Sequence, residues 1–282
     1  MKKIFALSAF IALSIFCAHH AVSQIRVEKN YHFTNDTLSF VSFFDYFPFS
    51  EKQKCSDAGL FKELIDNLQK TANKEIEAYC AETYEKAVDK GAKKGADIIL
   101  GMYADNDLYE EWKIIYPAII DNPVHLVMTP TLISQVKGID DLKELKGAIN
   151  SHDHFSDFVR EQLKKFDIET LDSSDEMYRK LITGEIDYIF TTYWYGMAEA
   201  IKLGVKNMVS FSKRGIWNMP LFIGVSKMSP SRRSLSHYLT EWIGQEELRQ
   251  KIKDTAFETL KQLAEESTGI VPEEYNLNKS NM

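Results

Sequence analysis

A tetrapeptide with two histidines is the segment of this sequence most suited to chemistry. Residues 151–154 read Ser-His-Asp-His. On an extended strand His152 and His154 would point the same way and could ligate a metal ion, with Asp153 or His125 as a third ligand. A polar loop can equally precede a helix, where Ser151 or Asp153 caps the first turn and free N–H groups attract an anion. The alternatives are a capping loop that also contacts a ligand, a plain cap, and a metal site; we expect the first, with no metal or other cofactor.

Carboxylates are concentrated in a second segment, which follows an apolar run. Residues 105–111 contain Asp105, Asp107, Glu110 and Glu111, and the chain has no arginine between positions 26 and 160. A ligand anion at this wall would be repelled. The segment therefore predicts a surface unsuited to anionic ligands.

Motifs of the common enzyme classes are missing from the sequence. It contains no Gly-x-Ser-x-Gly, phosphate-binding loop, His-Glu-x-x-His or Cys-x-x-Cys. We therefore expect the chain not to be an enzyme. Cys55 and Cys80 could form one disulfide, which would stabilise the fold by about 3–4 kcal/mol, or could remain two buried thiols.

The first residues predict export. Lys2 and Lys3 precede an uncharged apolar run over residues 4–18, and Ala21-Val22-Ser23 offers small residues for cleavage. This is the layout of a secretory signal peptide over residues 1–23, and the run is short for a membrane-spanning helix. The prediction is a periplasmic protein whose mature chain begins near Gln24. An uncleaved N-terminal anchor is the alternative.

Length and composition place the rest of the chain among globular proteins. The 282 residues are 44% hydrophobic and 27% charged, with a formal net charge of −7. A chain of this length builds one large or two moderate domains, and its composition excludes intrinsic disorder. The acidic balance argues against a nucleic-acid partner and against a polybasic membrane patch.

The pattern of apolar residues predicts two successive α/β groups. The first has strands over residues 37–44, 75–80 and 96–103 that alternate with helices over 59–71 and 84–93, which is a βαβαβ unit. Trp112 and Trp242 fall in helical stripes and are expected in the core. The second group and the tail comprise strands over 124–128, 147–150, 186–191 and 221–226, helices over 140–145, 155–166, 177–183 and 194–203, and a helical C-terminus.

Seven short motifs occur in order along these elements. They are Asp45-Tyr46-Phe47-Pro48-Phe49, Gly59-Leu60-Phe61, Gly95-Ala96-Asp97, Tyr116-Pro117, Gly138-Ile139-Asp140-Asp141-Leu142, Gly184-Glu185-Ile186-Asp187 and Phe222-Ile223-Gly224-Val225-Ser226-Lys227 with Pro230. Each is weak alone, but their order over residues 37–230 resembles the family 3 periplasmic solute-binding proteins. These are the amino-acid-type binding components of ABC transporters.

The resemblance implies an α/β, two-lobed periplasmic binding protein type II fold. Two mixed sheets would be joined by crossover segments near residues 125–129 and 220–222. Lobe 1 would comprise residues 24–125 and 221–282, and lobe 2 residues 126–220. A small-molecule ligand would lie in the cleft between the lobes, which close by a hinge motion. The implied partner is an ABC permease, and the protein is expected to be a monomer.

The sequence departs from this family at two charged positions. The family binds the ligand's α-carboxylate with a Thr-x-x-Arg pair after its third strand, and the corresponding residues here are Asp105 and Leu108. The aspartate that binds the ligand's ammonium group in the family corresponds to Thr192. A standard α-amino acid is therefore not expected as the ligand, whereas a neutral or cationic ligand, or none, fits better.

Aromatic and polar residues after the predicted strands are the candidate ligand contacts. Such positions would face the cleft, where aromatic rings suit a flat or cationic ligand, although ordinary core packing explains each ring equally well. The predicted ligand-binding residues are Asp45, Tyr46, Phe47, Tyr103, Asp105, Ser151, His152, Asp153, Thr192, Tyr193 and Trp217.

Three functions follow from this pattern. The first is a solute-binding protein that delivers a small polar ligand to an ABC permease. The second is an envelope sensor or accessory protein with the same fold and no transport role. A small periplasmic enzyme on this fold is the third.

Overall fold

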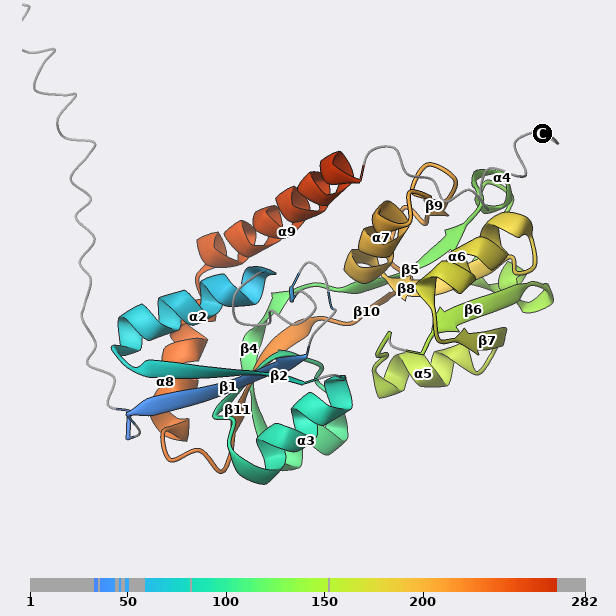
Figure 1. Ribbon diagram of the computed structural model, residues 1–282. Coiled ribbons are helices and arrows are strands. Elements are labelled where there is room, and N and C mark those ends of the chain that lie inside the picture. Colours follow the sequence, from blue (N-terminus) through green and yellow to red (C-terminus); the bar gives the residue numbers. More distant parts are fainter. Residues whose placement is uncertain are drawn as a thin grey trace, which may run out of the picture. The chain divides into compact units, whose positions relative to one another are not determined.

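The computed structural model describes residues 33–34, 36–43, 46, 49–50, 59–81, 83–151 and 153–267 (Figure 1). All of them belong to one compact unit that spans His32–Met282. The predicted signal peptide lies outside the described residues, as does Cys55. Cys80 is disulfide-bonded. None of the helices in the described ranges is long and apolar enough to cross a membrane.

The first sheet contains the predicted βαβαβ unit. Its strand order is β2-β1-β3-β11-β4, and β1 pairs in parallel with both β2 and β3. The late strand β11 inserts antiparallel between β3 and β4. The elements are β1 (Thr37–Phe43), α2 (Gly59–Ala72), β2 (Glu75–Ala81), α3 (Tyr84–Lys94), β3 (Ile98–Met102), η1 (Asn106–Glu110), β4 (Trp112–Ile120) and β11 (Leu221–Ser226).

The second sheet is also mixed and carries its own helices. Its order is β10-β5-β8-β6-β7, with β9 paired to β5. Strand β6 is parallel to β7 and β8, whereas β5 is antiparallel to β8. The elements are β5 (Pro123–Met128), α4 (Pro130–Ile133), η2 (Ile139–Glu144), β6 (Lys146–Asn150), α5 (Asp157–Leu163), β7 (Asp167–Leu171), α6 (Ser174–Thr183), β8 (Tyr188–Thr192), α7 (Tyr193–Lys202), β9 (Ser210–Phe211) and β10 (Trp217–Asn218).

Local sequence explains how these elements begin and end. The Thr83 hydroxyl accepts a hydrogen bond from the Lys86 N–H and so caps α3. Gly95 ends that helix with φ +129°, a conformation that favours glycine. Strand β3 is buried on both faces, which matches its continuous apolar sequence.

An aspartate ties each sheet together at the start of a strand. Asp97 precedes β3, and its carboxylate accepts a hydrogen bond of 2.9 Å from the Ser39 N–H of β1. Asp187 precedes β8, and its carboxylate accepts one of 2.8 Å from the Lys146 N–H of β6. The aspartates of the Gly95-Ala96-Asp97 and Gly184-Glu185-Ile186-Asp187 motifs therefore perform the same structural task, once in each sheet.

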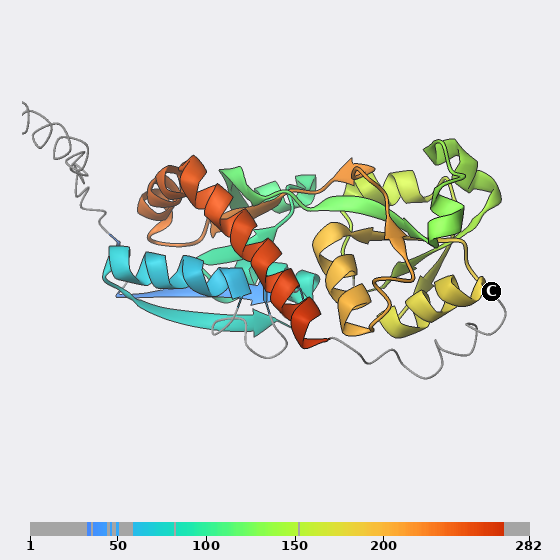
Figure 2. The ribbon, with the colours of Figure 1, turned by 90° about the horizontal axis from the view of Figure 1, so that it is seen from above.

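Two helices at the C-terminus complete the described chain. Helix α8 (Arg232–Ile243) packs on β4 and β11. Helix α9 (Glu246–Glu266) contacts α2, α8 and β4 of the first sheet and α7 of the second (Figure 2). A single helix thus links elements of both sheets.

The sequence patterns missed strands β4 and β7, as well as the two-residue strands β9 and β10. Trp112, expected in a helical stripe, is fully buried on strand β4 instead. Pro117 interrupts the apolar run of β4, and the sheet accepts it because β4 lies at the edge. Strand β7 also lies at an edge and is mostly exposed, so it has no continuous apolar pattern to detect.

Candidate functional site

Side chains of both lobes meet where several strands end. The first lobe is built on the first sheet and the second lobe on the second. Tyr46 follows β1, Tyr103 follows β3, and Asn122 lies between β4 and β5. Asp153 follows β6 and Thr192 ends β8. These five residues are named the interlobe cluster here. Their position is the one at which α/β sheets commonly present ligand-binding groups.

Tyr46 connects the two lobes through its hydroxyl group. The hydroxyl oxygen lies 3.0 Å from the Tyr103 hydroxyl and 3.2 Å from Thr192 Oγ1, and it accepts a hydrogen bond of 2.5 Å from Asn122 Nδ2. The ring stacks on Tyr195 at an interplanar angle of 8°. Burial, followed by the charge of Asp153, raises the pKa of Tyr46 well above its usual range. The phenol is therefore neutral and acts as a hydrogen-bonding group.

Asp153 is the buried carboxylate of the cluster, with 5% of its surface exposed. Its Oδ2 accepts hydrogen bonds from Thr191 Oγ1 at 2.7 Å and from the Thr192 N–H at 3.1 Å. Burial raises the pKa of Asp153 from 3.8 to about 6, although these hydrogen bonds oppose the rise. No Lys, Arg or His among the described residues forms an ion pair with it. The site therefore holds a carboxylate that no cation of the described chain neutralises.

Thr192 is the position at which the resemblance placed an ammonium-binding aspartate. Its backbone N–H and its hydroxyl both contact Asp153, with the Oγ1–Oδ1 distance at 3.4 Å. A carboxylate is thus present beside residue 192, delivered by a different loop. The position of residue 192 in the sequence did not reveal that Asp153 supplies a carboxylate there.

His154 lies against the first lobe. Its ring centroid is 4.0 Å from that of Tyr84 and 5.5 Å from that of Tyr103, and its Nδ1 is 2.8 Å from Glu85 Oε1. Burial lowers the pKa of His154. Asp105 makes a second contact between the lobes, because its Oδ1 accepts a hydrogen bond of 3.2 Å from the Asp157 N–H.

The other predicted ligand-binding residues lie elsewhere. Ser151 is exposed and donates its backbone N–H to Leu171 O. The Tyr193 ring contacts His125 at 5.1 Å, and the Trp217 ring contacts Phe190 at 5.1 Å. The structure therefore brings Tyr46, Tyr103, Asp153 and Thr192 together, whereas Asp105 contacts the other lobe through the Asp157 N–H. Asp45, Phe47 and His152 lie outside the described residues.

Among the described residues, no three His, Cys, Asp or Glu side chains are grouped so that they could bind a metal ion. His125 and His154 have different surroundings. His125 Nδ1 lies 2.8 Å from Ser212 O, within the second lobe, whereas His154 contacts the first lobe.

Asn122 is a member of the cluster that the sequence patterns missed. It is fully buried, and its Oδ1 has no hydrogen-bond partner among the residues that the structure describes. The available signal was a single asparagine between an apolar run and Pro123, a few residues before the crossover predicted near residues 125–129. Such a position indicates a connection between strands but gives no hint that the amide is buried.

Trp194 joins both lobes to helix α9. Its indole N–H donates a hydrogen bond of 2.9 Å to Asp121 O, at the connection between β4 and β5. Its ring packs edge-on against Phe49 at 6.1 Å and against Phe257 of α9 at 4.9 Å. Trp194 therefore has a packing role between the lobes.

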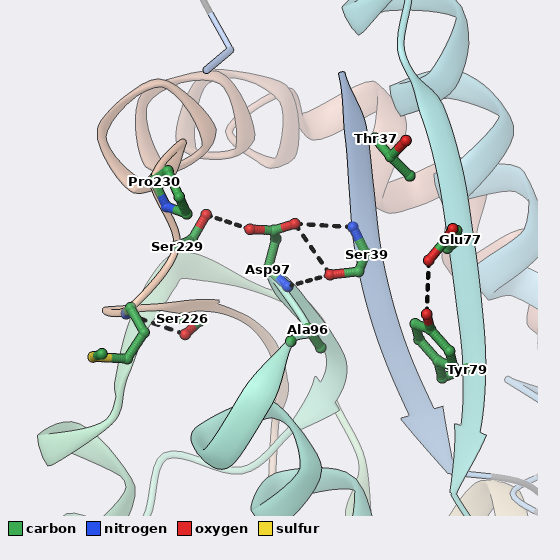
Figure 3. Close-up of a pocket in the computed structure, with 11 residues that line it drawn as sticks. Thr37, Ser39, Glu77, Tyr79, Ala96, Asp97, Ser226, Ser229 and Pro230 are labelled. Atoms are coloured by element: carbon green, nitrogen blue, oxygen red, sulfur yellow. Dashed lines mark hydrogen bonds between the residues drawn. The ribbon is translucent and has the colours of Figure 1, made fainter. Parts of the chain in front are cut away.

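A cavity of about 310 Å³ lies in the first lobe, and Asp97 lines it (Figure 3). Figure 3 shows the Asp97 carboxylate between Ser39 and Ser229. One oxygen accepts from the Ser39 N–H and hydroxyl at 2.9 and 3.1 Å, and the other accepts from the Ser229 hydroxyl at 2.5 Å. Both oxygens are satisfied, so this carboxylate supports the fold.

Replacing Asp97 with alanine is expected to lower the free energy of unfolding by about 2–4 kcal/mol, because it removes hydrogen bonds from β1 and the β11–α8 connection to a buried charge. Urea denaturation measures the loss. Asp36→Ala is the control: Asp36 is exposed and pairs with Lys74 at the surface, so its loss should change stability by at most about 0.5 kcal/mol. Equal stability of the two variants would contradict the assigned role of Asp97.

No protein-family model and no curated protein sequence matches the chain. Solved structures do match. A candidate ABC-transporter binding component from Wolinella succinogenes, complexed with lysine, aligns with TM-score 0.64 and 17% identity over 81% of this chain and 95% of that chain. An ancestral amino-acid-binding protein, a precursor of cyclohexadienyl dehydratase, aligns with TM-score 0.57 and 20% identity over 83% and 96%.

A histidine kinase sensor domain with similarity to periplasmic binding proteins aligns with TM-score 0.58 and 14% identity, over 83% of this chain and 97% of that chain. The matched structures thus include transport-type binding proteins and a sensor domain. The two mixed sheets of this chain form the two lobes that such structures have. The chain therefore has the two-lobed periplasmic binding protein fold of the amino-acid ABC transporter binding components, at low sequence identity to them.

Proposed function

We propose that this protein is an exported, non-catalytic solute-binding protein whose lobes close over a small polar ligand at the interlobe cluster. The observation that carries the proposal is the convergence of Tyr46, Tyr103 and Asn122 from one lobe on Thr192 and Asp153 from the other. A ligand bound between these groups would contact both lobes and favour the closed arrangement. In the periplasm the closed protein would present its ligand to an ABC permease.

We propose the lobe division expected from the sequence, residues 24–125 and 221–282 for lobe 1 and residues 126–220 for lobe 2, with the first boundary moved to residues 121–122 because β5 (Pro123–Met128) pairs within the second sheet. Supporting it, the chain passes from β4 to β5 between Ile120 and Pro123 and from β10 to β11 between Asn218 and Leu221. Short connections of this kind absorb the change in backbone angles when lobes move as rigid bodies.

The ligand is not expected to be a standard α-amino acid. Where a carboxylate-binding pair would lie, Asp105 is itself a carboxylate and accepts a hydrogen bond from the Asp157 N–H. A ligand carboxylate beside it would be repelled. A neutral or cationic ligand is compatible with the same wall.

A sensor or accessory role in the envelope is the second candidate. The observation favouring it is that the Tyr46 hydroxyl already contacts polar groups of both lobes, so protein side chains alone can join them. The match to a sensor domain agrees with such a role at the level of fold.

A thermal-shift screen of the chain from Gln24 onward tests the two candidates. The panel contains amino acids, polyamines, quaternary amines, sugars and divalent metals. A compound that binds only the folded protein adds about 2.7 kcal/mol of stability at 100 times its dissociation constant. A clear shift with a small organic molecule supports the solute-binding function. A folded protein that responds to nothing on the panel contradicts it and favours the accessory role.

A further inference from the structure

We propose that the ligand of the interlobe cluster is an alkylamine without a carboxylate, whose ammonium group is held by Asp153 and Asn122 among tyrosine rings. This inference rests on the solute-binding function proposed above and names its ligand class. It differs from the zwitterion expected of an amino-acid binder, because only the cationic end has a complementary group.

The charges at the contact between the lobes favour a cation. Asp153 is buried, and Asp105 and Glu85 make contacts across the lobes. Asp157 pairs with Arg160, which also donates to Phe155 O. Four carboxylates against one guanidinium leave a net charge of −3 on this set of residues, and His154 adds no positive charge when neutral. Such a site attracts cations and repels carboxylates.

Asn122 indicates that the ligand donates hydrogen bonds. Within the described chain its Oδ1 is buried without a partner, while its Nδ2 donates to the Tyr46 hydroxyl. That hydroxyl contacts Thr192 Oγ1, which contacts Asp153 Oδ1. One hydrogen-bonded chain therefore has an open acceptor at one end and a carboxylate without a countercharge at the other. An ammonium group supplies N–H donors and the missing positive charge.

The surrounding rings suit the same ligand class. Tyr46 and Tyr195 are stacked with centroids 6.1 Å apart, and Tyr103 and Tyr84 lie 5.2 Å apart beside them. Ring faces attract alkylammonium groups through cation–π interactions and also pack against methylene groups. An alkylammonium ligand that takes the place of the Tyr46 hydroxyl in these hydrogen bonds would therefore still be surrounded by aromatic rings.

The test uses three compounds of matched length: cadaverine, lysine and 1,5-pentanediol. Cadaverine is lysine without its carboxylate, and the diol has the same chain without charge. Cadaverine at millimolar concentration is expected to raise the melting temperature of the chain from Gln24 onward, with at least a tenfold lower dissociation constant than either comparison compound. Choline, which has no N–H donor at its cation, should bind more weakly than cadaverine.

Asp153→Asn is the decisive variant because it keeps the shape of the side chain and removes its charge. It should weaken cadaverine binding by about 10- to 100-fold. Asp36→Asn, at an exposed position, should leave binding unchanged. Circular dichroism and the melting temperature without ligand establish that each variant is folded.

The outcomes separate the two proposals. Equal or tighter binding of lysine, 1,5-pentanediol or choline would overturn the alkylamine inference while leaving the solute-binding function intact. Undiminished cadaverine binding by the Asp153→Asn variant would overturn the assigned role of Asp153. A folded protein that binds neither cadaverine nor anything in the wider screen would overturn both.

Discussion

Replacing Gly196 with alanine is expected to destabilise the protein by about 3–5 kcal/mol, although the same change stabilises most helix interiors. Gly196 lies within α7. A Cβ atom there would be 2.2 Å from Thr191 Cγ2 and 3.0 Å from Thr191 Oγ1. Thr191 is fully buried and donates its hydroxyl to Asp153. The added methyl group must therefore displace Thr191 and break a buried hydrogen bond to a carboxylate. Urea denaturation measures the loss.

A matched glycine and a compensating change make this prediction specific. Gly138 has φ −161°, and a Cβ atom there would have no described atom within 4 Å, so Gly138→Ala should change stability by at most about 0.5 kcal/mol. Adding Thr191→Ser to Gly196→Ala removes the clashing methyl group and keeps the hydroxyl, so the pair should recover most of the lost stability. A Gly196→Ala variant as stable as the parent would contradict the contact.

The Asp153→Asn variant is expected to be more stable than the parent at neutral pH. Burial raises the pKa of Asp153 from 3.8 to about 6, so the folded state binds its proton more tightly than the unfolded state. The stability that protonated Asp153 contributes is complete below pH 3.8 and is lost as the pH rises through about 6. A shift of about two pKa units corresponds to about 3 kcal/mol.

The stability difference between the Asp153→Asn variant and the parent should therefore increase as the pH rises. It should be small near pH 3.8 and grow to about 3 kcal/mol in favour of asparagine above pH 6. Urea denaturation of both proteins across this range measures it. Taking the difference removes the contributions of other groups, such as Glu85 and His154. If the free energies of unfolding of the two proteins changed in parallel with pH, the burial of a charged Asp153 would be contradicted.

Much of the first sheet follows from local patterns. The helix Gly59–Ala72 buries Phe61, Ile65 and Leu68 at helical spacing, and β3 is a continuous apolar run that is buried throughout. The predicted strands, helices and their parallel order therefore agree with the structure. Local patterns did not predict the edge strands β4 and β7, because an edge position tolerates proline and polar residues that obscure a strand pattern.

The sequence predicted only part of the candidate site. Tyr46, Tyr103, Asp153 and Thr192 were predicted from their places after strands, and the structure brings them together. Tyr193 and Trp217 follow or form strands too, yet their rings face His125 and Phe190. Strand ends locate a region of the molecule, but the direction of each ring depends on its neighbours in space.

By itself the sequence determined the α/β architecture, the aspartates Asp97 and Asp187 that precede two strands after a glycine, and the lack of an arginine between positions 26 and 160. These follow from residue types and short spacings along the chain. Only the tertiary structure decided that Asp153 is buried beside Thr192, that Asn122 Oδ1 lacks a partner among the described residues, and that Tyr46 reaches Thr192 across 146 residues. Burial, charge compensation and hydrogen bonding are set by groups that are distant in sequence, because they depend on which side chains exclude water from one another.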